Sequence, residues 1–594
     1  SSSNPVEAAP VSVADAGQEP YESVLITVED VEVAQLLDYG EWVVTDLPPS
    51  SYLLCDDLND YVYFPKPGDH LDSITGTLFY TYGSFKLEPR ATDDITGEPI
   101  PHYALHGHVV TMNDAREVVR RGYVEILGDE TMAIHRHRPP AIPVAHTGGL
   151  IFPGLIDSHN HPPYNVLDRI PLQETFTERY QWQQKPLYGA FQTQLFQIAN
   201  YGGNPDAYAQ YENLAKLAEV RALTAGTTAI QGVYGYFRPA VAHQGIVIDN
   251  IERYPTRAYP ETFPLRQTEA SWQDLATENW ERFIIHLSEG TSEAALQEFY
   301  TWQHWGMLDA RTTIIHGVPY GKPEWAAMAE VGAHLIWSPT SNLVLYGTTP
   351  DIPGALAAGV NVALAPDWTP SGARHILEEL KRASRINTEQ WGGLITPLQF
   401  AEFVTRNAAD AAGVQRFMGQ ITPAYRANLM VIPGSPSHPY DDLLRAEPAN
   451  VRLVVVDGRP MYGNPGILRQ LDVVDGVETI RVGGALQGLA IQVEAHAIPE
   501  SDRPFAEILT ELTEAYEAAE PKVCASLGVD SAGPGRPHAW APSASSQAVR
   551  LRSERPGAPE LWPPTNAVPS VRVDPASLLE LETQHLTGPV PGAR

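Results

Sequence analysis

Two histidines two positions apart, His159 and His161, close an apolar run that extends from Gly149 to Ile156. Such a run predicts a buried strand. Side chains alternate between the faces of a strand, so we expect both imidazoles on one side, with Asp157 on the same face to orient one of them. Two imidazoles on one face can hold a single metal ion. The stretch is therefore a candidate metal site.

Similar residues end other apolar runs further along the chain. His286 closes one run and is followed by Glu289, His316 closes another, and Asp367 follows a third. A single buried histidine is often an ordinary hydrogen-bonded core residue. A same-face pair with acids nearby is different, because burying it without a partner would cost too much desolvation. We therefore expect these strand ends to converge on one site.

The elements that would carry these residues alternate between short apolar strands and longer helical patterns over residues 150–415. Repeated β then α over this length predicts a (β/α)8 barrel, whose reactive residues lie at the carboxyl ends of the strands. An open doubly wound sheet is the alternative, but no glycine-rich phosphate loop opens any unit. The fold class is thus α/β, with a TIM-like barrel at residues 153–423.

Other parts of the chain have different patterns. Short β-like runs at residues 103–152 and 424–465 predict two halves of one split β-sandwich domain, and residues 21–97 predict a small all-β unit. We expect a flexible leader at residues 1–20, a C-terminal extension at 466–525 and an irregular tail at 526–594, which contains 11 prolines. His106/His108 and His135/His137 repeat the two-residue spacing, and we interpret them as surface or packing residues.

Composition excludes several classes of function. No run of about 18 apolar residues is present, so no membrane span is expected. The net charge of −32, and 18 acidic against 3 basic residues in positions 1–97, argue against nucleic-acid binding. Cys55 and Cys524 are too few for a cysteine metal site. The polar start at Ser1 favours an exported protein, periplasmic, lipoprotein-like or extracellular, with a cytoplasmic one as the alternative.

In order and spacing, the motifs at the strand ends resemble the amidohydrolase superfamily of metal-dependent hydrolases and deaminases over about residues 104–465. They are Pro153-Gly154-Leu155-Ile156-Asp157-Ser158-His159-Asn160-His161, Ala225-Gly226-Thr227-Thr228, His286-Leu287-Ser288-Glu289-Gly290, His316-Gly317, Ser338-Pro339-Thr340-Ser341-Asn342 and Asp367-Trp368-Thr369-Pro370. Residues 21–97, with Ser73-Ile74-Thr75-Gly76 and Tyr82-Gly83-Ser84-Phe85, resemble OB-fold-type domains of secreted bacterial proteins. We expect that unit to be an attachment or spacer.

The amidohydrolase resemblance implies specific roles for these residues. His159, His161, His286 and Asp367 would hold one divalent metal, Zn²⁺ or alternatively Fe²⁺, which suits three imidazoles and a carboxylate. Asp367 would also accept the proton of the attacking water, Glu289 would carry a proton to the leaving nitrogen, and His316 would polarise the carbonyl.

A single metal is favoured over two. Binuclear members of the superfamily usually bridge their metals with a carboxylated lysine on the fourth strand, which we expect near residues 255–263. The sequence has no lysine between Lys216 and Lys322. A glutamate bridge from Glu261 is the alternative.

These expectations define a function and its rivals. The leading hypothesis is a metal-dependent hydrolase of non-peptide, including cyclic, C–N bonds, and the alternative is a deaminase of an aminated heterocycle. A secreted binding protein that uses the OB-like unit is the non-enzyme rival. Nine aromatic residues between Phe176 and Tyr211 indicate a bulky or ring-containing small-molecule substrate. Homo-oligomerisation is left open.

Overall fold

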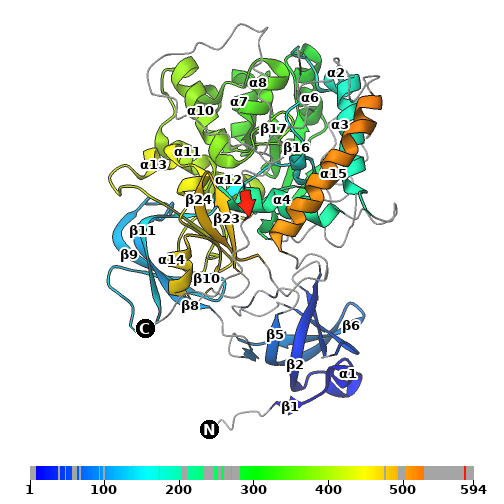
Figure 1. Ribbon diagram of the computed structural model, residues 1–594, viewed down its shortest axis with the longest axis vertical. Coiled ribbons are helices and arrows are strands. Elements are labelled where there is room, and N and C mark those ends of the chain that lie inside the picture. The colour runs from blue at the N-terminus through cyan, green and yellow to red at the C-terminus, as the bar shows by residue number, and fades with distance from the viewer. Residues whose placement is uncertain are drawn as a thin grey trace.

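The computed structural model arranges the chain as a small N-terminal β-unit, a large β-sheet and a barrel surrounded by helices (Figure 1). The structure describes residues 8–37, 41–46, 48–56, 63, 65, 69–91, 94–97, 101–140, 142–170, 172, 174–202, 210–232, 247–251, 256–259, 269, 281–471, 473, 477–491, 504–526 and 581–583. Glu261 and most of the predicted tail lie outside these residues.

The N-terminal unit is built from five strands that close into a ring. β2 (Leu25–Leu36), β3 (Trp42–Asp46), β4 (Tyr52–Cys55), β6 (Ser84–Pro89) and β5 (His70–Thr81) pair in that order, and β5 pairs back with β2. Alternate side chains such as Ile26 and Val28 fill the interior. The short β7 (Ile95–Thr96) pairs antiparallel with Ser73 and Ile74 of β5.

The first residues differ from the flexible leader that the sequence suggested. β1 (Ala9–Pro10) pairs in parallel with β2, and helix α1 (Val13–Ala16) buries Val13 and Ala16 in the core of the N-terminal unit. A short 3-10 turn at Glu19–Tyr21 leads into β2. Val13 and Ala16 are enough to anchor α1 because the N-terminal unit offers them an apolar core. The composition of residues 1–20, which is mostly polar, does not reveal this contact.

Strands from before and after the barrel form one continuous sheet. Its order is β10 (Glu130–His135), β9 (Val118–Leu127), β8 (His102–Val110), β11 (Val144–Pro153), β20 (Leu429–Ile432), β21 (Leu453–Val456), β22 (Arg459–Gly463), β24 (Ala485–Leu489), β23 (Glu478–Val482) and β25 (Leu581–Thr583). The expected extension beyond residue 465 and the expected irregular tail therefore both contribute strands to this sheet, at β23, β24 and β25.

The apolar run before His159 is two strands rather than one. β11 belongs to the large sheet and ends at Pro153, whereas β12 (Leu155–Asp157) is the first barrel strand. The chain changes sheet at Gly154, whose amide donates to Asn428 O. A Cβ at Gly154 would lie 2.1 Å from Thr228 Oγ1, so the crossing needs glycine. Hydrophobicity is continuous through the crossing because both strands are buried.

The barrel strands all pair in parallel and follow chain order among the described residues. They are β12, β13 (Thr227–Ile230), β14 (Asp249–Asn250), β15 (Thr256–Tyr259), β16 (Arg282–Leu287), β17 (Thr312–His316), β18 (His334–Trp337) and β19 (Asn361–Leu364). β15 falls where the fourth strand was expected. Beyond the strand ends, Asn160 and Asp367 form a parallel bridge that joins the last strand to the first.

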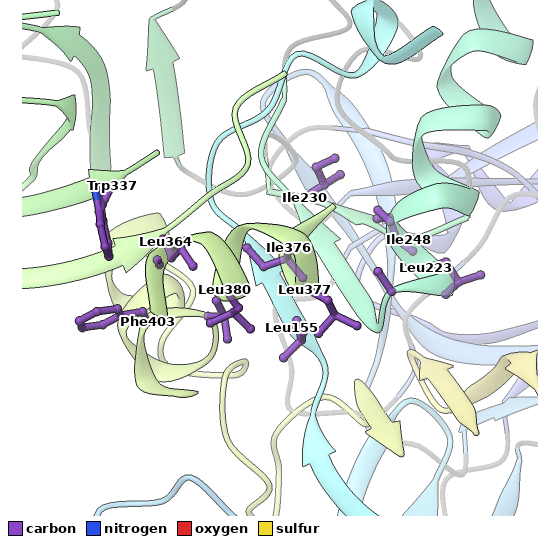
Figure 2. Packing of buried hydrophobic residues seen from close by; sticks show 14 of the residues in the cluster. Leu155, Leu223, Ile230, Ile248, Trp337, Leu364, Ile376, Leu377, Leu380 and Phe403 are labelled. Carbon is purple, nitrogen blue, oxygen red and sulfur yellow. The ribbon is translucent and has the colours of Figure 1, made fainter. Parts of the chain in front are cut away.

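Helices surround the barrel strands, and most of them follow a strand. They are α2 (Arg179–Gln183), α3 (Pro186–Ala199), α4 (Tyr211–Thr224), α6 (Glu293–His304), α7 (Lys322–Val331), α8 (Pro339–Tyr346), α9 (Ile352–Ala358), α10 (Ile376–Trp391), α11 (Pro397–Phe403), α12 (Arg406–Ala412) and α13 (Pro439–Arg445), whereas α14 (Pro465–Leu468) packs on the large sheet. Alternate strand residues point inward and outward, so the barrel has two apolar layers. Ile284, Ile315 and Ile336 lie in the inner cluster with the alanines of α12. Leu364 and Trp337 point outward into the cluster that also holds Leu380 of α10 and Phe403 of α11 (Figure 2).

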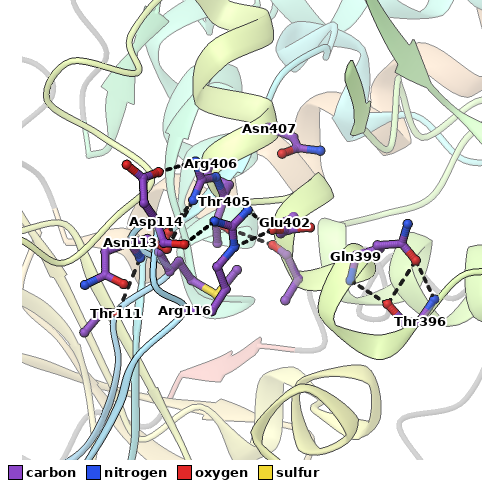
Figure 3. Close-up of polar contacts among 12 residues, drawn as sticks. Thr111, Asn113, Asp114, Arg116, Thr396, Gln399, Glu402, Thr405, Arg406 and Asn407 are labelled. Carbon is purple, nitrogen blue, oxygen red and sulfur yellow. Dashed lines mark hydrogen bonds and ion pairs between the residues drawn. The ribbon is translucent and has the colours of Figure 1, made fainter. Parts of the chain in front are cut away.

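Polar contacts join the large sheet to the barrel helices. Arg116, in the turn after β8, donates from Nε and Nη2 to Glu402 Oε1 of α11 at 2.8 and 2.6 Å. Arg406 of α12 donates to Asp114 at 2.8 Å (Figure 3). Arg459 of β22 likewise donates to Asp69 of the N-terminal unit at 2.7 Å. These contacts connect the three parts of the molecule.

The long helix α15 (Phe505–Ser526) packs along α3 at the side of the barrel (Figure 1). Its Tyr516 hydroxyl donates to Asp168 Oδ2 at 3.0 Å, so the helix contacts the loop that follows the first barrel strand. None of the helices among the described residues combines the length and apolar character that crossing a membrane requires.

Candidate metal centre

The predicted ligands all lie at the carboxyl ends of barrel strands. His159 and His161 follow β12, His286 is the fifth residue of β16, His316 ends β17 and Asp367 follows β19. The carboxyl ends of parallel barrel strands open on the same face. Residues separated by more than 200 positions in the sequence are therefore neighbours at the barrel mouth.

Closure of the barrel brings Asp367 to the two histidines after the first strand. The Asp367 amide donates to His159 O at 3.2 Å, and the His161 amide donates to Asp367 O at 3.3 Å. As a result, Asp367 Oδ1 lies 3.3 Å from His159 Nε2 and 3.4 Å from His161 Nε2. The last strand thus supplies a carboxylate directly opposite the first pair of imidazoles.

Two overlapping groups of side chains have ligand atoms within 4.8 Å of one another, and His159 belongs to both. One group adds His161 and Asp367, and the other adds His286 and His316. The structure therefore brings all the predicted ligands around His159. It also places His316, predicted to polarise a carbonyl, as close to His159 and His286 as a ligand would be.

The donor set fits a divalent metal. His286 Nδ1 is buried and has no hydrogen-bond partner among the residues that the structure describes, a costly arrangement unless an ion takes its lone pair. Burial lowers the pKa of His161 to about 3 and lowers the pKa of His286 well below its usual value. Burial would raise the pKa of Asp367, but the close approach of His159 and His161 holds that pKa below its usual range. Neutral imidazoles beside a carboxylate are the protonation states that a metal requires.

Backbone strain is concentrated at the same positions. His316 and Asp367 have φ values of 77° and 67°, and Ser288, just before Glu289, has 56°. Side-chain-bearing residues rarely adopt these angles, which cost about 1–3 kcal/mol each and are found most often at functional sites. The strained positions thus coincide with the strand ends that carry His316, Asp367 and Glu289.

Polar neighbours hold the imidazoles in place. His159 Nδ1 lies 3.4 Å from Gln231 Oε1, and His316 Nδ1 lies 2.9 Å from Asn342 Oδ1. Asp157 has a different role from the predicted one. Its Oδ1 accepts from the His159 backbone amide and its Oδ2 from Asn160 Nδ2, so it holds the main chain rather than an imidazole.

Glu289 is held by two residues that the sequence did not assign to the site. The Tyr346 hydroxyl donates to Glu289 Oε1 at 2.7 Å, and Arg179 Nη1 lies 3.0 Å from Oε2. Glu289 Oε2 is also 3.7 Å from His316 Nε2. Trp182 Nε1 in turn donates to the Tyr346 hydroxyl at 3.0 Å. The buried carboxylate therefore carries a fixed network of partners beside His316.

The first loop of the barrel reaches Glu289 because glycine follows it. The Arg179 amide donates to Glu289 O, and a Cβ at Gly290 would lie 2.3 Å from Thr177 O. Only glycine allows the loop to pass this closely. Arg179 falls in the aromatic-rich segment between Phe176 and Tyr211, but nothing local showed where its side chain would point.

Aromatic side chains form the wall beside His161. The ring centroid of Trp368 lies 5.7 Å from that of His161, 5.1 Å from Tyr164 and 5.9 Å from Trp182. The His161 side chain is 25% exposed, against 3% for His159 and 5% for Asp367. The aromatic wall therefore adjoins the accessible side of the centre.

Comparison with known proteins gives consistent matches. Residues 272–461 match the amidohydrolase family. A 5-methylthioadenosine/S-adenosylhomocysteine deaminase from Bacillus cereus (strain 03BB102) is 23% identical over 433 residues, which cover 62% of this chain and 95% of the relative.

Solved structures share the fold. An adenosine deaminase from Xanthomonas campestris with bound zinc has 16% identity and a TM-score of 0.53, covering 71% of this chain and 99% of that one. A variant of atrazine chlorohydrolase from Arthrobacter aurescens TC1, complexed with zinc and atraton, has 15% identity and a TM-score of 0.52, covering 70% and 100%.

Proposed function

This chain belongs to the amidohydrolase superfamily, and we propose that it is a metal-dependent hydrolase of non-peptide carbon–nitrogen bonds. The observation that carries the proposal is the convergence of four histidines and Asp367 from four strand ends, with ligand atoms within 4.8 Å in two groups that share His159. A binding protein that used the barrel as a scaffold would have no need for four buried or half-buried imidazoles around one carboxylate, with His286 Nδ1 unpartnered among the described residues.

The metal would be held by His159, His161, His286 and Asp367, with His316 as a neighbour at ligand distance. A bound divalent ion supplies water activated for attack near neutral pH. Zn²⁺ suits this set, with Fe²⁺ as the alternative. The absence of a lysine between Lys216 and Lys322 supports one ion rather than two.

The residues around the ion have complementary roles. The Asp367 carboxylate accepts the proton of the attacking water. His316 faces the reacting carbon's oxygen or ring nitrogen and stabilises the charge that develops there. Glu289, whose charge Arg179 favours, accepts a proton and passes it to the leaving nitrogen. Because Glu289 Oε2 and His316 Nε2 are 3.7 Å apart, the two groups can act on the same substrate centre.

Two reactions fall within this class. Hydrolysis of amides or cyclic amides needs only the features above. Deamination of an aminated heterocycle is the second candidate, which the names of the curated and structural relatives favour. The wall formed by Trp368, Tyr164 and Trp182 supports a bulky or ring-containing substrate.

Two further assignments accompany the proposal. The closed five-strand ring of the N-terminal unit supports an OB-like spacer, and the strands of the large sheet support a split sandwich. Homo-oligomerisation is kept as an open alternative to a monomer.

A substrate panel tests the proposal. Metal-stripped and zinc-loaded protein would be offered amides, ureas, lactams and amino-heterocycles, including aminopurines and aminotriazines, with release of ammonia or amine as the readout. We expect turnover that is lost with a chelator and restored by zinc. Failure to bind stoichiometric metal under every loading condition would refute the proposal.

A further inference from the structure

A row of ring side chains crosses four strands on the outward face of the large sheet. His135 of β10 is in register with Tyr123 of β9, Tyr123 with His106 of β8, and His106 with His146 of β11. The residues adjacent in sequence, such as Leu105 and Ala145, are buried in the sheet's core cluster. Because strand side chains alternate, the row faces away from that core.

Two imidazoles of this row meet through the nitrogens that could bind an ion. His106 Nδ1 and His146 Nδ1 are 3.0 Å apart and share a hydrogen bond, in which the N–H of one ring donates to the lone pair of the other. Two ring nitrogens that each lie about 2.0–2.1 Å from one ion, at octahedral to tetrahedral angles, are separated by about 2.9–3.4 Å. The pair therefore already has the spacing of a two-histidine chelate.

The surroundings hold the His106–His146 pair in this arrangement. The His106 ring lies 4.6 Å from the Tyr123 ring, tilted by 34°, and the His146 amide donates to Gln470 Oε1 at 3.0 Å. Burial lowers the pKa of His106, and the neighbouring His146, His108 and Arg121 act in the same direction. The His106 ring is therefore neutral at neutral pH and carries one N–H, so its other nitrogen keeps a lone pair.

A second group on the same face provides a contrast. Glu125 pairs through Oε1 with His102 Nε2 at 2.9 Å and through Oε2 with His135 Nε2. Each carboxylate oxygen thus takes one imidazole, and the group satisfies itself. In the His106–His146 pair the two nitrogens bond to each other instead, and an ion would take both lone pairs once the proton between them is displaced.

We propose that His106 and His146 form a second metal site, which binds one divalent first-row ion such as Zn²⁺, Ni²⁺ or Cu²⁺ with water completing its shell. Imidazole suits these ions, whereas Ca²⁺ and Mg²⁺ prefer oxygen. With two protein ligands on an exposed face, the ion binds more weakly than at the barrel centre and exchanges freely. It links β8 to β11, which are paired in parallel within the sheet.

Equilibrium dialysis of the metal-stripped full chain against zinc tests the site, with bound zinc measured by elemental analysis. The wild type should bind a tight ion and a weaker one. His106→Ala/His146→Ala should lose the weaker ion and keep the tight one, which also shows that the variant is folded. His159→Ala/His161→Ala should lose the tight ion and keep the weaker one. The matched control His102→Ala/His135→Ala should keep both ions.

The outcomes separate this inference from the proposed function. Weaker binding that persists in His106→Ala/His146→Ala, or no weaker ion in the wild type, overturns the second site. If the wild type binds only an ion that depends on His106 and His146, the second site stands and the barrel assignment falls.

Discussion

Replacing Arg179 by methionine tests the network that holds Glu289. The Glu289 side chain is 3% exposed, with Oε2 3.0 Å from Arg179 Nη1 and Oε1 accepting from Tyr346 at 2.7 Å. Methionine keeps an apolar chain of moderate length but removes the positive charge, so a buried carboxylate is left with the Tyr346 hydroxyl. Removing one partner of a buried ion pair costs about 3–5 kcal/mol.

Calorimetry of the barrel transition measures this loss. A chain with several domains does not unfold in one step, so the midpoint of that transition is the useful quantity. For a unit of this size 1 kcal/mol shifts the midpoint by about 2–4 °C, and we therefore expect a fall of about 6–20 °C at pH 8.

A double variant supplies the decisive control. Arg179→Met/Glu289→Gln removes both charges and should recover most of the lost stability, because no buried charge remains. Arg179→Lys keeps the charge and should lose less than Arg179→Met. A fall of under about 2 °C in Arg179→Met, or no recovery in the double variant, would show that the ion pair does not hold this site together.

Three further predictions concern the metal, the pH dependence and the N-terminal unit. Asp367→Asn should lower bound zinc and turnover while the barrel transition persists; full zinc content and full turnover together would show that the ligand is misassigned. Burial raises the pKa of Glu379 from 4.5 to about 8, so its stabilising contribution is complete below pH 4.5 and is lost as the pH rises through 8. Glu379→Gln can still accept from the Thr340 amide. This variant should make the midpoint of the barrel transition less dependent on pH, with a higher midpoint than the wild type at pH 8. Deleting residues 1–97 removes the Asp69–Arg459 contact but should leave kcat unchanged, and a large loss of kcat in a folded truncate would show that the unit takes part in catalysis.

Local patterns were sufficient to predict the architecture around the site. Alternating strand and helix patterns predicted the barrel, because each strand is buried on both faces and each helix on one. The local patterns gave a wrong prediction where the same residues fit two different structures. The run from Gly149 to Ile156 is equally apolar in both of its strands, and the crossing at Gly154 depends on Thr228, more than 70 residues away. Residues 9–16 pack only because the five-strand ring offers them a core.

By itself, the sequence determined which residues could bind a metal and that they end strands, since residue type and periodicity are local properties. The tertiary structure alone decided which of them meet. Closure of the barrel sets Asp367 against His159 and His161, and the path of the first loop past Gly290 sets Arg179 against Glu289. These contacts depend on where distant segments pack, and the free energy that places them comes from burying whole helices and strands rather than from the residues that touch.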